Sequence, residues 1–285
     1  MPHILSVLGT CLSLMLVSAC ADGDRPETVM DPPYDFTAGT VFEIIRTDDP
    51  SSFVCLHFRG RATRQMWDKR VSREFNHKVY LYNAYFTDGT RFEVHVNPEF
   101  ESQKVAATEA FRYMRGFGQL PTVLREGIRS LGIHRGDKTA SAGSGKIFVY
   151  QDNAIKRQSR NKLEETLFHE SVHASLHNEY VNSRAWRAVQ KADQGFMTEY
   201  ARDKFPREDM AETALFAWGI LRHPGRIPPA DTADIKAVVP NRIAFLGEIL
   251  PVEGEIFDIP EDGPVTLADA PKGCMTEAPK QPMHS

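Results

Sequence analysis

Residues 163–178 read LEETLFHESVHASLHN and contain the pattern HExxH, with His169, Glu170 and His173 at its fixed positions. Two histidines four residues apart lie on one face of an α-helix, where both imidazoles can point at one metal ion. The glutamate beside the first histidine can reach a water on that ion. Zinc binds neutral imidazole nitrogens, and a catalytic zinc keeps one position open for water. The alternative is a polar helix that carries two histidines by chance.

The residues around this pattern predict a helix over about 162–178. Asn161 followed by Glu164 has the form of a capping box, which marks the start of a helix. The apolar residues Leu163, Leu167 and Val172 follow at helical spacing. The HExxH pattern therefore falls inside a predicted helix, as metal binding by both histidines requires.

A metal site of this kind needs a third protein ligand, for which Glu208 is the best candidate. It lies in a second predicted helix, in which Pro206 suits the first turn. Glu208 and Glu212 share one helix face, where two buried carboxylates repel each other unless a cation or donor lies between them. We expect Glu208 to bind zinc and Glu212 to accept the free ring N–H of a ligand histidine. The alternative is an exposed acidic first turn, as we expect for Asp209.

HExxH followed by a helix with Glu-x-x-Ala-Glu at 208–212 resembles the gluzincin metallopeptidases, in particular the anthrax lethal factor-type catalytic domain. The resemblance covers about residues 100–250. It implies an α+β, zincin-like fold with a small sheet, an edge strand, an active-site helix and a second helix that bears a glutamate. It also implies that Glu208 is the third zinc ligand and that Tyr200 assists the transition state. For Tyr200, the alternative is a packed aromatic residue.

His177 extends the motif by one further turn of the predicted helix. It lies roughly 12 Å along the helix axis from His169, which is too far for the two to share an ion easily. A fourth protein ligand would also close the site to water. We therefore expect His177 to support the site or the fold without binding the metal.

The chain divides into five predicted segments. They are a lipoprotein signal peptide at 1–20, a flexible tether at 21–33, a small β-rich region at 34–98, the zincin-like domain at 99–251 and a C-terminal tail at 252–285.

Strand patterns precede the helical ones along the chain. Strands are predicted at 41–45, 52–58, 79–86 and 91–96, the last two joined by an Asp-Gly turn. A strand at 145–150 would border the cleft in the resembled fold and pair with an extended peptide. The Ser/Gly-rich stretch 139–145 would be a mobile lip. Further helices are predicted at 101–115, 121–130, 183–192 and 239–250.

The first twenty residues resemble a bacterial lipoprotein signal. Residues 4–19 are apolar and small and end in Leu-Val-Ser-Ala before Cys20, which would carry the lipid. An apolar run this short suits a signal peptide better than a membrane span. The resemblance implies a protein of the bacterial cell envelope, held by lipid to a membrane, and Ala21 favours the outer membrane. The alternative is an ordinary cleaved secretory signal.

Cysteine usage agrees with export. The chain has four cysteines, of which Cys11 lies in the signal and Cys20 would be lipidated. Cys55 and Cys274 remain and would form a disulfide in an oxidising compartment. The alternative is two free thiols.

Composition narrows the function classes. The net charge of −4 gives no basic surface for nucleic acid. With 41% hydrophobic and 25% charged residues, the 285-residue chain suits one globular unit, which we expect to be a monomer. The favoured function is zinc-dependent hydrolysis of peptide or protein substrates, with Glu170 as general base. The alternative is a lipid-anchored envelope binding or assembly protein with a structural or degenerate zinc site.

Overall fold

The computed structural model describes residues 25–26, 28–40, 42–250 and 257–280. The expected signal peptide, Cys20 and the first residues of the expected tether lie outside the described residues. Within the described part of the chain, no helix has both the length and the apolar character needed to cross a membrane.

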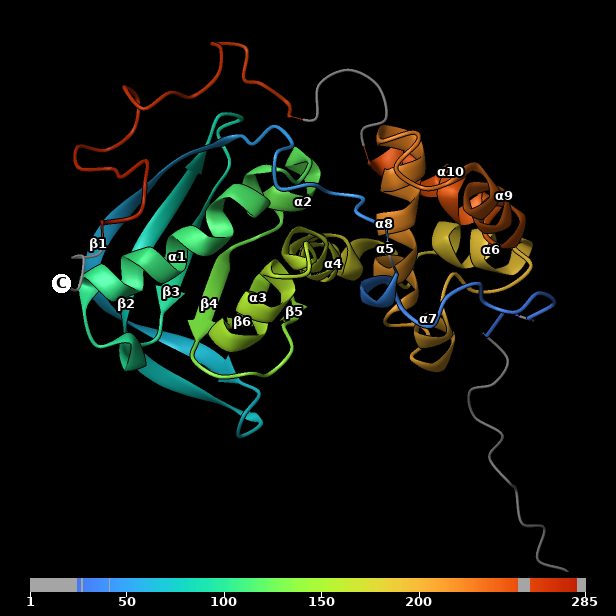
Figure 1. The fold of residues 1–285 in the computed structure, drawn as a ribbon, viewed down its shortest axis with the longest axis horizontal. Coiled ribbons are helices and arrows are strands. Elements are labelled where there is room, and N and C mark those ends of the chain that lie inside the picture. Colours follow the sequence, from blue (N-terminus) through green and yellow to red (C-terminus); the bar gives the residue numbers. More distant parts are fainter. Residues whose placement is uncertain (1–24, 27, 41, 251–256, 281–285) are drawn as a thin grey trace, which may run out of the picture.

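The fold is α+β and is built on one six-stranded mixed sheet with the strand order β1-β2-β3-β4-β6-β5 (Figure 1). Strands β1, β2 and β3 are antiparallel neighbours, β4 runs parallel to both β3 and β6, and β5 is antiparallel to β6. The strands are β1 (Phe53–Asp68), β2 (Arg73–Phe86), β3 (Arg91–Val96), β4 (Ser130–His134), β5 (Ser141–Gly143) and β6 (Lys146–Tyr150).

The expected β-rich region and the expected zincin-like domain fold together. Strand β3 belongs to the first region and pairs in parallel with β4 of the second, with Val94 opposite Leu131. Buried residues from Phe42 to Leu250 form one hydrophobic cluster. The boundary expected at 98–99 therefore lies inside a continuous sheet and core.

Helix α4 (Leu163–Ser175) lies in the middle of the molecule, between the sheet with its helices and a second group of helices (Figure 1). It packs against α1, α2, α3 and β5 on one side and against α8 on the other. The remaining helices are α1 (Gln103–Gly118), α2 (Thr122–Glu126), α3 (Gln151–Gln158), α5 (His177–Tyr180), α6 (Arg184–Ala192), α7 (Glu199–Asp203), α8 (Asp209–Arg222), α9 (Pro229–Val238) and α10 (Pro240–Ile249), with 3-10 turns at Thr37–Gly39 and Pro98–Phe100.

Several element boundaries differ from the sequence prediction. Residues 42–45 form bends rather than a strand, and β1 continues ten residues beyond the expected end at 58 because it pairs with β2 along its whole length. The expected helix at 121–130 is the five-residue α2, which is followed by β4. Asn161 does not cap α4: it has a positive φ of 54°, and its side chain donates to Glu43.

The Ser/Gly-rich stretch forms the edge strand and its turn. Ser144 and Gly145 both have positive φ, 49° and 77°, as the two central residues of a type I′ hairpin turn require. A Cβ atom on Gly145 would lie 2.7 Å from Arg129 Nε, so glycine is needed there. Strand β5 is therefore the sheet edge. Strand β6, which was expected to border the cleft, lies between β4 and β5.

The described part of the expected tether is held against the protein. The backbone N–H groups of Val29 and Met30 donate to Gln194 O at 2.7 and 2.9 Å, and Met30 and Tyr34 form parallel bridges with Gly195 and Thr198. Residues 28–34 thus lie along the segment that joins α6 to α7 and are not a free spacer.

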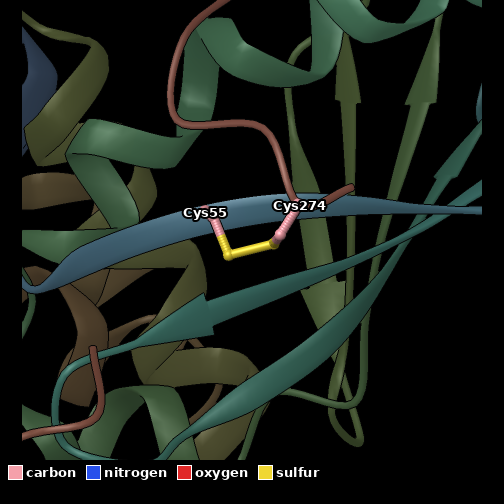
Figure 2. The surroundings of a disulfide bond; sticks show 2 residues. All are labelled: Cys55 and Cys274. Carbon is pink, nitrogen blue, oxygen red and sulfur yellow. A yellow bond between two sulfur atoms is a disulfide. The ribbon is translucent and has the colours of Figure 1, made fainter. Parts of the chain in front are cut away.

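The C-terminal tail is attached to the outer strand of the sheet. Figure 2 shows the disulfide that joins Cys55 in β1 to Cys274 in the tail. Beside it, Leu56 and Met275 exchange two backbone hydrogen bonds of 2.8 and 2.9 Å. The tail therefore covers part of the edge of β1, which would otherwise expose unpaired backbone groups.

Candidate metal centre

Three donor atoms converge between α4 and the start of α8. His169 Nε2 and His173 Nε2 lie 3.2 Å apart. Glu208 Oε2 lies 3.3 Å from His169 Nε2 and 2.9 Å from His173 Nε2. Among the residues that the structure describes, this is the group of histidine, cysteine and acidic side chains whose geometry suits a metal ion.

The spacing of these donors fits zinc. Two donors bound to one tetrahedral zinc at about 2.0–2.1 Å lie roughly 3.3–3.4 Å apart, close to the three separations observed. Two imidazole nitrogens and one carboxylate are also a ligand set that catalytic zinc sites use. A fourth, open position would face the cavity described below.

The packing around α8 fixes the position of Glu208. Glu208 is the residue just before α8, one position outside the helix in which the sequence placed it. The next residue, Asp209, is fully buried, and its Oδ2 accepts hydrogen bonds from Gln190 Nε2 at 2.7 Å and Arg242 Nε at 3.0 Å. The expectation that Asp209 is a solvated charge is therefore wrong, because α6 and α10 cover it and supply its donors.

Glu212 lies behind the centre, on the His169 side. Its Oε1 is 3.4 Å from His169 Nδ1, a buried nitrogen with no hydrogen-bond partner among the described residues. Glu212 accepts hydrogen bonds of 2.8 Å from the Thr37 backbone N–H, the Thr37 hydroxyl and the Thr198 hydroxyl. The structure therefore brings Glu212 to the expected histidine and adds two threonines that no sequence motif indicated.

The charges in the site keep the third ligand ionised. Burial raises the pKa of Glu208, but hydrogen bonds from His169 and His173, together with their charges, hold it far below its usual value. Burial lowers the pKa of His169, but its hydrogen bond to Glu208 and the charges of Glu170 and Glu212 raise that pKa to about 9. A metal ion that enters the site must therefore displace a proton from His169.

Glu170 lies beside the donors and faces the same cavity. It is 8% exposed, and burial raises the pKa of its carboxyl group, against the charges of His169 and His173. Its place beside the three donors and at the cavity wall is where a carboxyl group could exchange protons with a metal-bound water.

The centre opens into a cavity of about 970 Å³. Strand β5 and the helix face with Glu170 form part of its wall. The turn of the β1–β2 hairpin forms another part, because Trp67, Lys69 and Ser72 line the cavity. No sequence motif indicated a function for this hairpin, because its turn reaches the cavity only through long-range strand pairing.

Tyr200 lines the cavity in front of the metal centre, whereas His177 does not. Tyr200 lines the cavity and is 40% exposed, and its backbone N–H donates to Asp35 O at 2.9 Å. Burial, and then the charges of Glu208 and Glu212, raise the pKa of its hydroxyl. The His177 ring centroid is 5.6 Å from that of His173, and His177 is absent from the donor group and from the cavity wall. His177 is the first residue of α5 and supplies no donor to the centre.

Comparison with known proteins identified no relative of this chain. No protein-family model matches the chain, and no curated protein or solved structure matches it significantly.

Proposed function

We propose that the protein is a zinc-dependent metallopeptidase of the gluzincin type. The observation that carries the proposal is the triangle of His169, His173 and Glu208 donors, with the buried carboxyl group of Glu170 beside it and an open cavity in front. Each of these features serves hydrolysis, and a helix with two chance histidines would need none of them.

Zinc held by these three ligands would supply Lewis-acid activation of water and polarise the scissile carbonyl. Glu170 accepts the proton of the attacking water and passes it to the leaving amine as the carbon–nitrogen bond breaks. The Tyr200 hydroxyl, at the cavity wall, donates to the oxygen that becomes negatively charged. Glu212 holds the orientation of His169, because its own position is fixed by three hydrogen bonds.

A peptide backbone suits the cavity better than a compact small molecule. Strand β5 has one strand neighbour in the described sheet, and all three of its residues line the cavity. An extended chain that pairs with such an edge is held through its backbone groups. The strand proposed to pair with the peptide is thus β5, whereas the sequence pattern indicated the strand that is β6.

The competing function is an envelope binding or assembly protein with a structural zinc site. Structural zinc sites are closed by four protein ligands. The described residues offer three donors here, and the site faces a large cavity. These two features favour the enzyme.

We propose that this activity operates in the bacterial cell envelope, with Cys20 lipidated. The support is the apolar run that ends in Leu-Val-Ser-Ala-Cys. Mass spectrometry of the mature N-terminus tests it, because an unmodified residue other than Cys20 at the terminus would refute the anchor.

Assay of purified mature protein with quenched-fluorescent peptide libraries tests the peptidase proposal. We expect cleavage by zinc-loaded protein and its loss after chelation, with recovery on adding zinc. The His169→Ala variant should bind little zinc and should not recover. Peptide cleavage that persists in fully chelated protein and in this variant would refute the proposal.

A further inference from the structure

We infer that the cavity selects peptides that carry carboxylate groups, held by Lys69, Arg129 and Arg157. The inference deepens the proposed function and rests on it. It draws on three cationic side chains of the cavity wall that are not metal ligands and that come from separate parts of the fold.

Two of these cations bracket the edge strand. Lys69, in the turn of the β1–β2 hairpin, donates from Nζ to Thr139 Oγ1 at 2.6 Å, just before β5. Arg129, between α2 and β4, donates from its guanidinium to Ser144 O, just after β5. Both partners are neutral, so neither positive charge is neutralised by a carboxylate among the described residues. An extended chain along β5 would pass one cation at each end.

The third cation lies on α3. Arg157 lines the cavity, and its partly buried guanidinium has neither a hydrogen bond nor an ion pair with any described residue. Burial and the charge of Arg160 lower the pKa of Arg157, and the charge of Glu170 opposes them. A partly buried arginine without an anion is poised to form bidentate hydrogen bonds with an incoming carboxylate.

Apart from Glu170, the acidic groups of the wall are already engaged. Glu208 and Glu212 belong to the metal centre. Glu165 is buried and paired with Lys162 at 2.7 Å, and it also accepts the Ile44 N–H at 2.7 Å. Glu74 is exposed and lies 3.9 Å from Lys146, so these two side chains offset each other. Once zinc neutralises its ligands, Glu170 is the carboxyl group left at the reacting centre, and Lys69, Arg129 and Arg157 are the cations left for the substrate.

The hydrogen-bond partners of Lys69 and Arg129 flank the strand: Thr139 precedes β5 and Ser144 follows it. A peptide that pairs with β5 would therefore meet Lys69 towards one end of the paired segment and Arg129 towards the other. Acidic side chains within the peptide, or a C-terminal carboxylate, offer the same chemistry.

The test uses decapeptide libraries with amidated C-termini in which one position at a time is fixed as Glu, Gln or Lys. A further set has Gln at the fixed position and a free C-terminal carboxylate. Zinc-loaded wild type should cleave the best Glu library at least about tenfold faster than its Gln counterpart, and the Lys library more slowly still. The preference should shrink as salt screens the charges. A rate gain confined to the free-carboxylate set would identify the chain terminus as the recognised group.

Arg157→Gln should lower the Glu-to-Gln rate ratio at least about fivefold. Lys156→Gln is the matched control, since Lys156 is the neighbouring residue on α3, is mostly exposed and is paired with Asp137 outside the cavity. Its ratio should equal that of wild type. Equal cleavage of Glu, Gln and free-carboxylate libraries, or a preference for Lys, would overturn the inference and leave the peptidase proposal standing.

Binding separates the two proposals if no library is cleaved. Fluorescence anisotropy would compare labelled Glu-rich and Gln-rich decapeptides on the zinc-loaded Glu170→Gln variant, with and without Arg157→Gln. Tighter binding of the Glu-rich peptide that depends on Arg157 would support carboxylate recognition and refute peptide hydrolysis. Equal binding of both peptides would refute carboxylate recognition.

Discussion

Thr37 donates both its backbone N–H and its hydroxyl to Glu212, each at 2.8 Å, across 175 residues of sequence. Both residues are buried and line the cavity. The segment just after the expected tether is therefore part of the metal centre, because it holds the carboxylate that lies behind His169. Residues 28–37 thus both hold the N-terminal segment against the protein and complete the surroundings of the metal centre.

Loss of the Thr37 hydroxyl should weaken the site without unfolding it. Thr37→Val keeps the shape and the backbone donor but removes one of three hydrogen bonds to Glu212. Changes to groups that orient a metal ligand cost about 10–100-fold in metal affinity or activity, so we expect a loss near tenfold. Zinc affinity is measured by competition with a chromophoric chelator. Thr108→Val is the control, because that hydroxyl bonds within α1. Unchanged zinc affinity and activity in Thr37→Val would contradict this role.

Acid should weaken the turn of the β1–β2 hairpin through Asp68. Burial raises the pKa of Asp68, but hydrogen bonds from the Arg70 guanidinium and backbone N–H outweigh it and lower the pKa to about 2. A carboxyl group with a lowered folded-state pKa stabilises the fold above its unfolded pKa, near 3.8. That contribution is lost as the pH falls from about 4 towards 2.

The free energy of unfolding of wild type and Asp68→Asn, measured by denaturant titration, tests this. The advantage of wild type should be full above about pH 5 and shrink steadily below pH 4. The variant should also show faster hydrogen exchange in this turn at neutral pH, because it lacks the Asp68 carboxylate that binds Arg70. The turn includes Lys69, which lines the cavity. An advantage of wild type that does not vary between pH 6 and pH 3 would show that Asp68 is not the titrating group.

The Cys55–Cys274 disulfide should stabilise the fold and hold the tail. It closes a loop of 219 residues, and the loss of such a bridge costs about 2–5 kcal/mol. The Cys55→Ser/Cys274→Ser variant should melt at a lower temperature, and protease should cleave its residues 257–280 first. Zinc content should remain, because the disulfide joins the tail to the outer strand β1, whereas the metal donors are His169, His173 and Glu208. An equal melting temperature and an equally resistant tail would mean that the other tail contacts suffice.

Local features of the chain were predictable from sequence. The HExxH helix, the turn at Asp88-Gly89 and the spacing of Glu208 from Glu212 depend on residues within a few positions of each other, so patterns reveal them. The Cys55–Cys274 pairing followed from the count of cysteines. Helices α1, α4, α6, α8 and α10 were therefore expected within a few residues of their observed bounds, whereas α2 was expected to be longer and α3, α7 and α9 were not expected.

Features that depend on distant partners were not predictable. Asp209 resembles any acidic residue at the start of a helix until Gln190 and Arg242 are seen to cover it. The extension of β1 beyond residue 58 is polar and becomes a strand only through pairing with β2. For the same reason, nothing in the sequence indicated that Thr37 or Lys69 would reach the cavity. Apart from the cysteine pair, no pattern in the sequence marked contacts made across 100 residues or more.

The most direct measurement of the central claim compares wild type with Glu170→Gln, each loaded with zinc and assayed on the same cleaved peptide. The variant keeps the shape of the side chain but cannot accept a proton. We predict equal zinc content, near one ion per chain, and a fall in kcat/KM of at least about a hundredfold, the scale of general-base loss. Equal zinc content with unchanged kcat/KM would contradict the account, because hydrolysis would then not depend on the carboxylate beside the metal ligands.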